Sequence, residues 1–90
     1  MKSVKVIISG RVQGVWYRAW TQEAARSRDL SGWVRNRSDG SVEAVFSGPE
    51  ADVAAMLEAA RKGPRLARVD NIETEACDAP EPGFVTLPTA

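Results

Sequence analysis

The residues best suited to chemistry lie in one short run near the N-terminus, Gly10-Arg11-Val12-Gln13-Gly14-Val15-Trp16-Tyr17-Arg18. Two glycines four residues apart let a backbone curl toward a ligand where a Cβ would obstruct it. Glycine spacing alone favours an ordinary turn between a strand and a helix. The residues around the glycines change that balance, because they leave hydrogen-bond donors and positive charge without a local partner.

The helix expected to begin at about Tyr17 has no side chain to cap its first turn. No Ser, Thr, Asp or Asn occurs from Gly10 to Trp20, so the opening N–H groups lack their usual acceptor. No acidic residue appears before Glu23 to offset the positive end of the helix dipole. Arg18 lies in this first turn, where its guanidinium and the free amides would surround a tetrahedral anion. The run therefore predicts a phosphate cradle, and it is not of the Walker type because no Lys-Ser/Thr pair follows Gly14.

Asn36 is the second candidate for chemistry. It ends the run Gly32-Trp33-Val34-Arg35-Asn36 and precedes a turn at Ser38-Asp39-Gly40. Taken alone, an asparagine in this position is typical of the entry to a turn. Its polar amide gains interest only if the fold brings it to the predicted cradle.

Apolar periodicity predicts the elements that position these residues. The alternation typical of strands occurs in Lys2–Ser9 and Val42–Ser47, and the Asp-Gly turn predicts that Trp33–Asn36 forms a hairpin with the latter. Val69–Ala76 is a mixed polar run that most resembles a strand with one solvent-exposed face, and Phe84–Leu87 fits a short additional edge strand. Helical spacing occurs in Tyr17–Arg28, with a core face of Tyr17, Trp20, Ala24 and Ser27. It occurs again from Pro49 to Gly63-Pro64, with a core face of Val53, Leu57 and Ala60 and with Ala54 and Met56 nearby. The order β-α-β-β-α-β is typical of the α+β ferredoxin-like sandwich, an antiparallel sheet with two helices on one face.

Length and charge limit the classes of function. Ninety residues, 43% of them apolar, predict one small domain over residues 1–90 with a shallow site and no large cofactor. Twelve basic side chains balance twelve acidic ones, but eight of the basic and three of the acidic lie in residues 1–40. The front of the chain is therefore suited to an anion. A neutral chain without a basic run argues against nucleic acid as the main partner.

Several kinds of catalysis are excluded by residues that the chain lacks. It has no histidine, which removes phosphohistidine chemistry, His-based triads and His-ligated zinc. Cys77 has no arginine six residues later, no two aspartates are spaced i, i+2, and no metal-ligand cluster occurs. We expect neither metal nor cofactor. A lone cysteine and the absence of a long apolar run predict a cytoplasmic protein with no membrane partner.

Together the runs Ile8–Arg18 and Gly32–Val42 resemble the two defining motifs of the acylphosphatases. The resemblance extends to chain length and element order, and it implies a ferredoxin-like fold. It also implies hydrolysis of the carboxyl–phosphate bond of acyl phosphates to carboxylate and inorganic phosphate, without metal or covalent intermediate. By the same resemblance Arg18 binds the phosphoryl group with loop amides and Asn36 holds the attacking water. The phosphate-binding residues so implied are Arg11, Val12, Gln13, Gly14, Val15, Trp16, Tyr17 and Arg18.

Three residues depart from the usual family pattern. Tyr17 stands where the family more often has Phe, Trp16 fills a variable position, and Arg37 follows Asn36 where some members have Thr. We expect Arg37 to add positive charge near the rim of the site.

The implied reaction suits a chain without histidine. An acyl phosphate leaves as a carboxylate whose conjugate acid has a pKa of about 4, so no general acid is needed at neutral pH. We expect a monomer acting on a small-molecule acyl phosphate, with inorganic phosphate or sulfate as competitive ligands. Two alternatives remain: a non-catalytic anion-binding or regulatory module that uses the same loop, and an RNA-binding sandwich.

Overall fold

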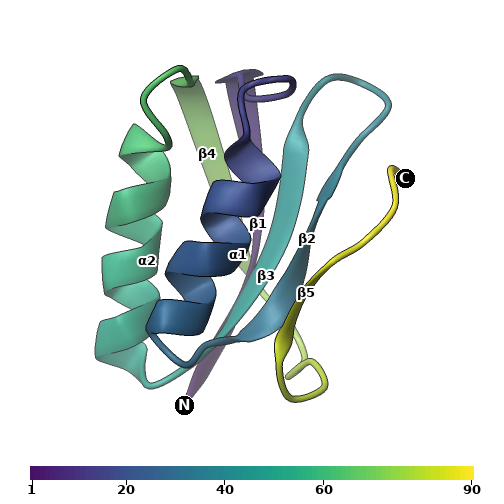
Figure 1. Ribbon diagram of the computed structural model, residues 1–90. Coiled ribbons are helices and arrows are strands. Elements are labelled where there is room, and N and C mark those ends of the chain that lie inside the picture. The colour runs from purple at the N-terminus through teal and green to yellow at the C-terminus, as the bar shows by residue number, and fades with distance from the viewer.

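The computed structural model describes residues 1–90, which form one five-stranded sheet with both helices on the same face (Figure 1). The elements are β1 (Lys2–Arg11), α1 (Tyr17–Ser27), β2 (Ser31–Asn36), β3 (Val42–Gly48), α2 (Glu50–Lys62), β4 (Arg68–Ala76) and β5 (Phe84–Thr86). The first six elements confirm the predicted β-α-β-β-α-β order and with it the ferredoxin-like sandwich.

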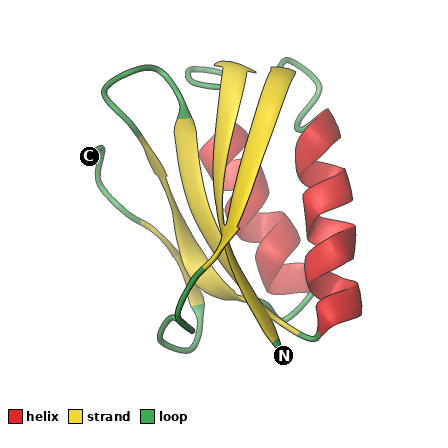
Figure 2. Cartoon of the chain, turned by 180° about the vertical axis from the view of Figure 1, so that it is seen from behind, coloured by secondary structure: helices red, strands yellow, loops and turns green.

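The sheet is antiparallel except at one edge. Its strands lie in the order β4-β1-β3-β2-β5, and β5 pairs parallel to β2. The predicted edge strand at Phe84 is therefore present, but it makes the sheet mixed rather than purely antiparallel. Residues 77–83 carry the chain from the β4 edge to the opposite edge in a short crossing, which Figure 2 shows from the open side. This crossing reverses the direction of the chain, so β5 runs against β4 and with β2.

The core lies between the helices and one face of the sheet. Alternate residues of β1, namely Val4, Val6 and Ile8, are buried there together with Phe46 of β3. The intervening residues of β1 are only half-buried on the face that no helix covers (Figure 2). The alternation of apolar residues in β1 therefore corresponds to one buried face and one partly solvent-exposed face.

The buried face of α1 differs from the predicted one. The structure buries Tyr17, Thr21 and Ala25, whereas Trp20 and Ala24 pack only at the margin of the core and Ser27 is exposed. The helix is rotated so that Thr21 and Ala25, one and two turns after Tyr17, lie in the core. The spacing of apolar residues could not indicate this face, because Thr21 is polar by residue type and yet is buried.

In α2 the buried residues are Val53, Met56 and Ala60, while Leu57 is only partly buried and Ala54, also expected to face the core, is exposed. The last turn of this helix is joined to α1 by a buried hydrogen bond in which the hydroxyl of Tyr17 donates to the carbonyl of Ala60 over 2.7 Å. In a continuing helix the amide of residue 64 would donate to that carbonyl, but Pro64 has no N–H. The phenol therefore satisfies a carbonyl that the helix itself leaves unpaired, and burial raises the pKa of Tyr17 well above its usual value.

Replacing Tyr17 with Phe tests this bond. We expect Tyr17→Phe to lower the free energy of unfolding by about 1–3 kcal/mol, because the buried carbonyl of Ala60 loses its donor. Ser27→Ala is the matched control, since it removes a hydroxyl that donates to the carbonyl of Ala24 in an exposed position. Its expected cost is below about 0.5 kcal/mol. Equal stability of the two variants in urea unfolding would contradict the assignment.

Candidate active site

The loop between β1 and α1 leaves a run of main-chain N–H groups without partners. No amide from Gln13 to Ala19 donates to any group of the protein, and the first bond of α1 runs from the amide of Trp20 to the carbonyl of Trp16 over 3.0 Å. Trp16 is the N-cap residue and supplies no side-chain cap, and the first turn holds no acidic residue. The free donors predicted from the sequence are therefore present.

Backbone conformation gives this loop its curl. Gly14 and Trp16 both have a left-handed φ, of 72° and 66° respectively. A Cβ at Gly14 would meet nothing within 4 Å, so its positive φ, and not crowding, favours glycine at this position. The strand leading into the loop has a register shift at Ser9/Gly10, where β1 pairs with β4, and such shifts commonly redirect a strand.

A pocket of about 570 Å³ opens beside this loop. It is lined by Val12, Gly14, Trp16, Tyr17, Arg18, Ala19, Gln22, Asn36 and Thr86. Arg18 is the one charged side chain among them, and it takes part in no ion pair. The arrangement therefore combines an unopposed guanidinium with unbonded amides, which suits a small anion.

Asn36 lies at the end of β2 and faces the same pocket as Arg18. The two residues meet because α1 packs against β2. The side-chain Oδ1 of Asn36 is buried and accepts no hydrogen bond from the protein. Its main chain is held in place, since its carbonyl accepts a bond of 3.0 Å from the amide of Ala90. The pocket thus contains an amide side chain with an unused acceptor, carried by a main chain that is held in place.

Three of the predicted loop residues do not line the pocket. Arg11 is exposed at the end of β1 and pairs with Arg68 in the sheet, and Val15 is buried in the core. Gln13 points its side chain away, toward the hairpin between β2 and β3. These residues contribute to the pocket only through the backbone that they hold in place.

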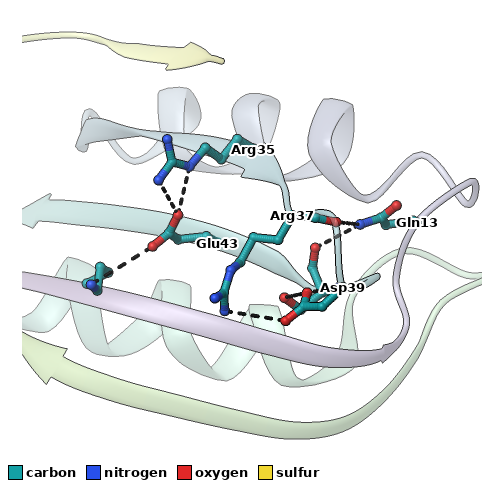
Figure 3. A network of polar contacts seen from close by, with 7 residues as sticks. Gln13, Arg35, Arg37, Asp39 and Glu43 are labelled. Atoms are coloured by element: carbon teal, nitrogen blue, oxygen red, sulfur yellow. Dashed lines mark hydrogen bonds and ion pairs between the residues drawn. The ribbon is translucent and has the colours of Figure 1, made fainter. Parts of the chain in front are cut away.

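The side chain of Gln13 ties the loop to the hairpin that follows Asn36 (Figure 3). Its Nε2 donates to the carbonyl of Arg37 over 2.8 Å and to the carbonyl of Ser41 over 2.9 Å. One side chain thereby fixes the distance between the unbonded amides and the strand that carries Asn36. This link joins residues that are 24 and 28 positions apart in the chain.

Arg37 does not add charge to the pocket, contrary to the sequence-based expectation. Its guanidinium lies 3.8 Å from Asp39 and lines a separate hollow together with Arg35 (Figure 3). Asp39 in turn accepts bonds from the hydroxyl and the amide of Ser41, at 2.6 and 3.0 Å, and these donors lower the pKa of its carboxyl group. Arg37 therefore belongs to the hairpin turn.

Three residues outside the predicted site also line the pocket: Ala19, Gln22 and Thr86. Gln22 lies one helical turn after Arg18, so helical spacing could have indicated it. Thr86 comes from β5 and donates to Oε1 of Gln22 over 2.8 Å. No sequence pattern could have placed Thr86 there, because its position depends on the parallel pairing of β5 with β2.

Fold and pocket together define a ferredoxin-like sandwich whose β1–α1 loop opens onto a pocket with one unpaired guanidinium. The family model described as acylphosphatase matches residues 4–86, and the chain belongs to the acylphosphatase family, whose members act on acyl phosphates. It is 58% identical over 90 residues to an acylphosphatase of Rhodospirillum rubrum, a match that covers 99% of each chain. It is 57% identical over 81 residues to one of Azorhizobium caulinodans, covering 90% of this chain and 87% of the other.

A solved structure agrees with these relatives. The crystal structure of acylphosphatase from Bacillus subtilis superimposes with a TM-score of 0.91 at 36% identity, covering 97% of this chain and 99% of the other. The family resemblance of the two motifs and the predicted fold are thereby confirmed. The structure has no group of three or more side chains suited to a metal ion. Neither helix has the length and apolar character needed to cross a bilayer.

Removing the Gln13 link tests whether it positions the loop. The fold should tolerate Gln13→Ala, because the carbonyls of Arg37 and Ser41 keep backbone donors in Gly40 and Arg37. We expect kcat for acyl phosphate hydrolysis to fall about 10- to 100-fold as the loop shifts relative to β2. The inhibition constant of phosphate should change far less, since the amides and Arg18 stay on one segment.

Gln13→Glu is the matched variant for this test. It keeps the length of the side chain, but a carboxylate has no N–H to donate to the two carbonyls. It should therefore lose as much kcat as the alanine variant. Normal kcat in either variant, with the fold intact by circular dichroism, would show that the link does not position the loop.

Proposed function

We propose that the pocket binds the phosphoryl group of an acyl phosphate through Arg18 and the amides of the loop from Arg11 to Tyr17. The observation that carries this proposal is the run of unbonded amides from Gln13 to Ala19 beside a guanidinium without an ion-pair partner. Charge-assisted bonds of this kind suit the three equatorial oxygens of a transferring phosphoryl group. Inorganic phosphate and sulfate have the same oxygen geometry and act as competitive ligands.

Asn36 orients the water that attacks phosphorus. Its buried Oδ1 accepts no bond within the protein, so it is available to a water hydrogen. A neutral amide cannot take up the proton, but the transition state of phosphoryl transfer is loose and needs an aligned water more than a deprotonated one. The proton passes to an oxygen of the phosphoryl group, and the P–O bond to the acyl group breaks as the water oxygen bonds to phosphorus.

The leaving group needs no assistance from the protein. The bond to phosphorus breaks to release a carboxylate, whose conjugate acid has a pKa of about 4. Positioning and charge stabilisation by this chain's own residues therefore account for the catalysis. The reaction requires neither metal ion nor cofactor, and residues 1–90 act as one domain.

The protein works as a monomer in the cytoplasm. The side chain of Cys77 is a free thiol, which suits a reducing compartment. The exposed large apolar residues lie on four separate segments: Met1, Trp16, Leu66 and Val85. Scattered exposed apolar residues of this kind are normal on the surface of a monomer.

Hydrolysis of benzoyl phosphate in the presence of EDTA tests this function. We expect turnover by the wild type to be insensitive to EDTA and to be inhibited competitively by phosphate. Arg18→Gln should lower kcat/KM by at least about 10³-fold and abolish phosphate inhibition, because the variant loses the one charge in the pocket.

Arg65→Gln is the control for charge, since Arg65 is exposed, lies outside the pocket and forms no ion pair. It should behave as the wild type. An Arg18→Gln enzyme with normal inhibition by phosphate would eliminate the cradle. Phosphate binding by a wild type that hydrolyses no acyl phosphate would indicate a non-catalytic anion-binding module instead.

Asn36 makes a separable contribution. Asn36→Ala should lower kcat about 10²- to 10³-fold while the inhibition constant of phosphate stays near the wild-type value, because water orientation is lost and the anion site is not. Asn71→Ala, at an exposed position of β4, serves as the control. Equal losses of kcat and phosphate affinity in Asn36→Ala would instead assign Asn36 to anion binding.

A further inference from the structure

Trp16 occupies an unfavourable position by two separate criteria. Its backbone is left-handed, with φ 66° and ψ 19°, a conformation that bulky residues rarely adopt. Its side chain is 77% exposed, although burying an indole is among the larger gains available to a small domain. Of the four large apolar side chains that are exposed, Trp16 is the one that lines the pocket.

Every other aromatic ring in the chain has a partner. Tyr17 and Trp20 pack with their centroids 5.5 Å apart, and Phe46 stacks on Phe84 at 5.7 Å. The remaining ring, of Trp33, carries the guanidinium of Arg35 at 4.8 Å from its centroid. Trp16 is the sixth aromatic residue and has neither a ring nor a cation against it.

The pocket has more room and more apolar lining than a phosphoryl group needs. Its volume of about 570 Å³ lies within the range of pockets that hold drug-sized ligands. Apart from Arg18 the lining is uncharged, and two of its polar side chains, Gln22 and Thr86, are hydrogen-bonded to one another. A charged acyl group would find no counter-ion in this part of the pocket. A neutral acyl group with a flat apolar surface would find the free indole.

We propose that Trp16 is a specificity-determining residue whose indole forms the platform for the acyl group, so that the enzyme prefers aromatic acyl phosphates to acetyl phosphate. This inference rests on the proposed function, because it assumes that the phosphoryl group lies at Arg18. Contact between two aromatic rings adds to the burial of the ring itself. The preference acts through the acyl group and leaves the affinity for inorganic phosphate unchanged.

The test compares kcat/KM for benzoyl phosphate and acetyl phosphate in the wild type, Trp16→Asn and Trp16→Phe. Asparagine tolerates the left-handed backbone, so Trp16→Asn removes the ring without straining the loop. We expect kcat/KM for benzoyl phosphate to fall about 5- to 10-fold in Trp16→Asn. The ratio of kcat/KM for benzoyl phosphate to that for acetyl phosphate should fall by a similar factor, and Trp16→Phe should retain most of the preference.

A second measurement avoids catalysis altogether. Phenylphosphonate should inhibit the wild type more strongly than methylphosphonate does, and Trp16→Asn should lose this difference. An unchanged ratio between the two substrates in Trp16→Asn would overturn the platform. So would parallel losses for both substrates and for phosphate, because they would show that the ring acts through the loop conformation. A wild type that hydrolyses neither substrate would overturn the proposed function itself, whereas active variants with unaltered selectivity overturn only the role of Trp16.

Discussion

The protein keeps a run of main-chain N–H groups free at the start of α1, and the rest of the site is arranged around them. An amide without an acceptor must meet water or a ligand, so such a run is normally capped. The second helix shows the usual solution, with Glu50 and Asp52 in its first turn. The first turn of α1 has neither a side-chain cap nor an acidic residue. Its one charged side chain is that of Arg18, which is positive and therefore suited to an anion.

Because the N–H groups of the loop make no hydrogen bonds within the protein, the side chains of the loop must hold its backbone in position. Val12 and Val15 are buried on either side of the turn, and Gln13 is bonded to the neighbouring hairpin. Tyr17 then fixes the first turn of α1 to the last turn of α2. The amides are therefore unbonded within a loop whose side chains are well anchored, which is the preorganisation that electrostatic catalysis depends on. The adjacent residues Trp16 and Tyr17 divide these tasks, because one ring lies outside at the pocket and the other is in the core.

The second half of the site comes from the sheet. Asn36 ends β2, and the C-terminal segment lies beside that strand through β5 and the bond from Ala90 to the carbonyl of Asn36. The same segment supplies Thr86 to the pocket wall. The parallel edge strand thus supports Asn36 and also bounds the pocket beside it. The free edge of the sheet therefore contributes directly to the site.

Local sequence patterns were sufficient for the element order, the uncapped start of the first helix and the interest in Arg18, whereas Asn36 was indicated only by the resemblance of the two motifs to a known family. These features depend on residues that are close together in the chain, such as alternating apolar residues, glycines and absent capping residues. They can therefore be recognised from the sequence alone. Tertiary packing decided which face of α1 is buried, where Arg37 points, and that Gln13, Gln22 and Thr86 bound or brace the pocket. These features depend on contacts between segments far apart in the chain, and the direction of β5 in particular follows from where the crossing after β4 ends. Local sequence patterns do not predict contacts between distant segments, because these contacts form only when the sheet is assembled.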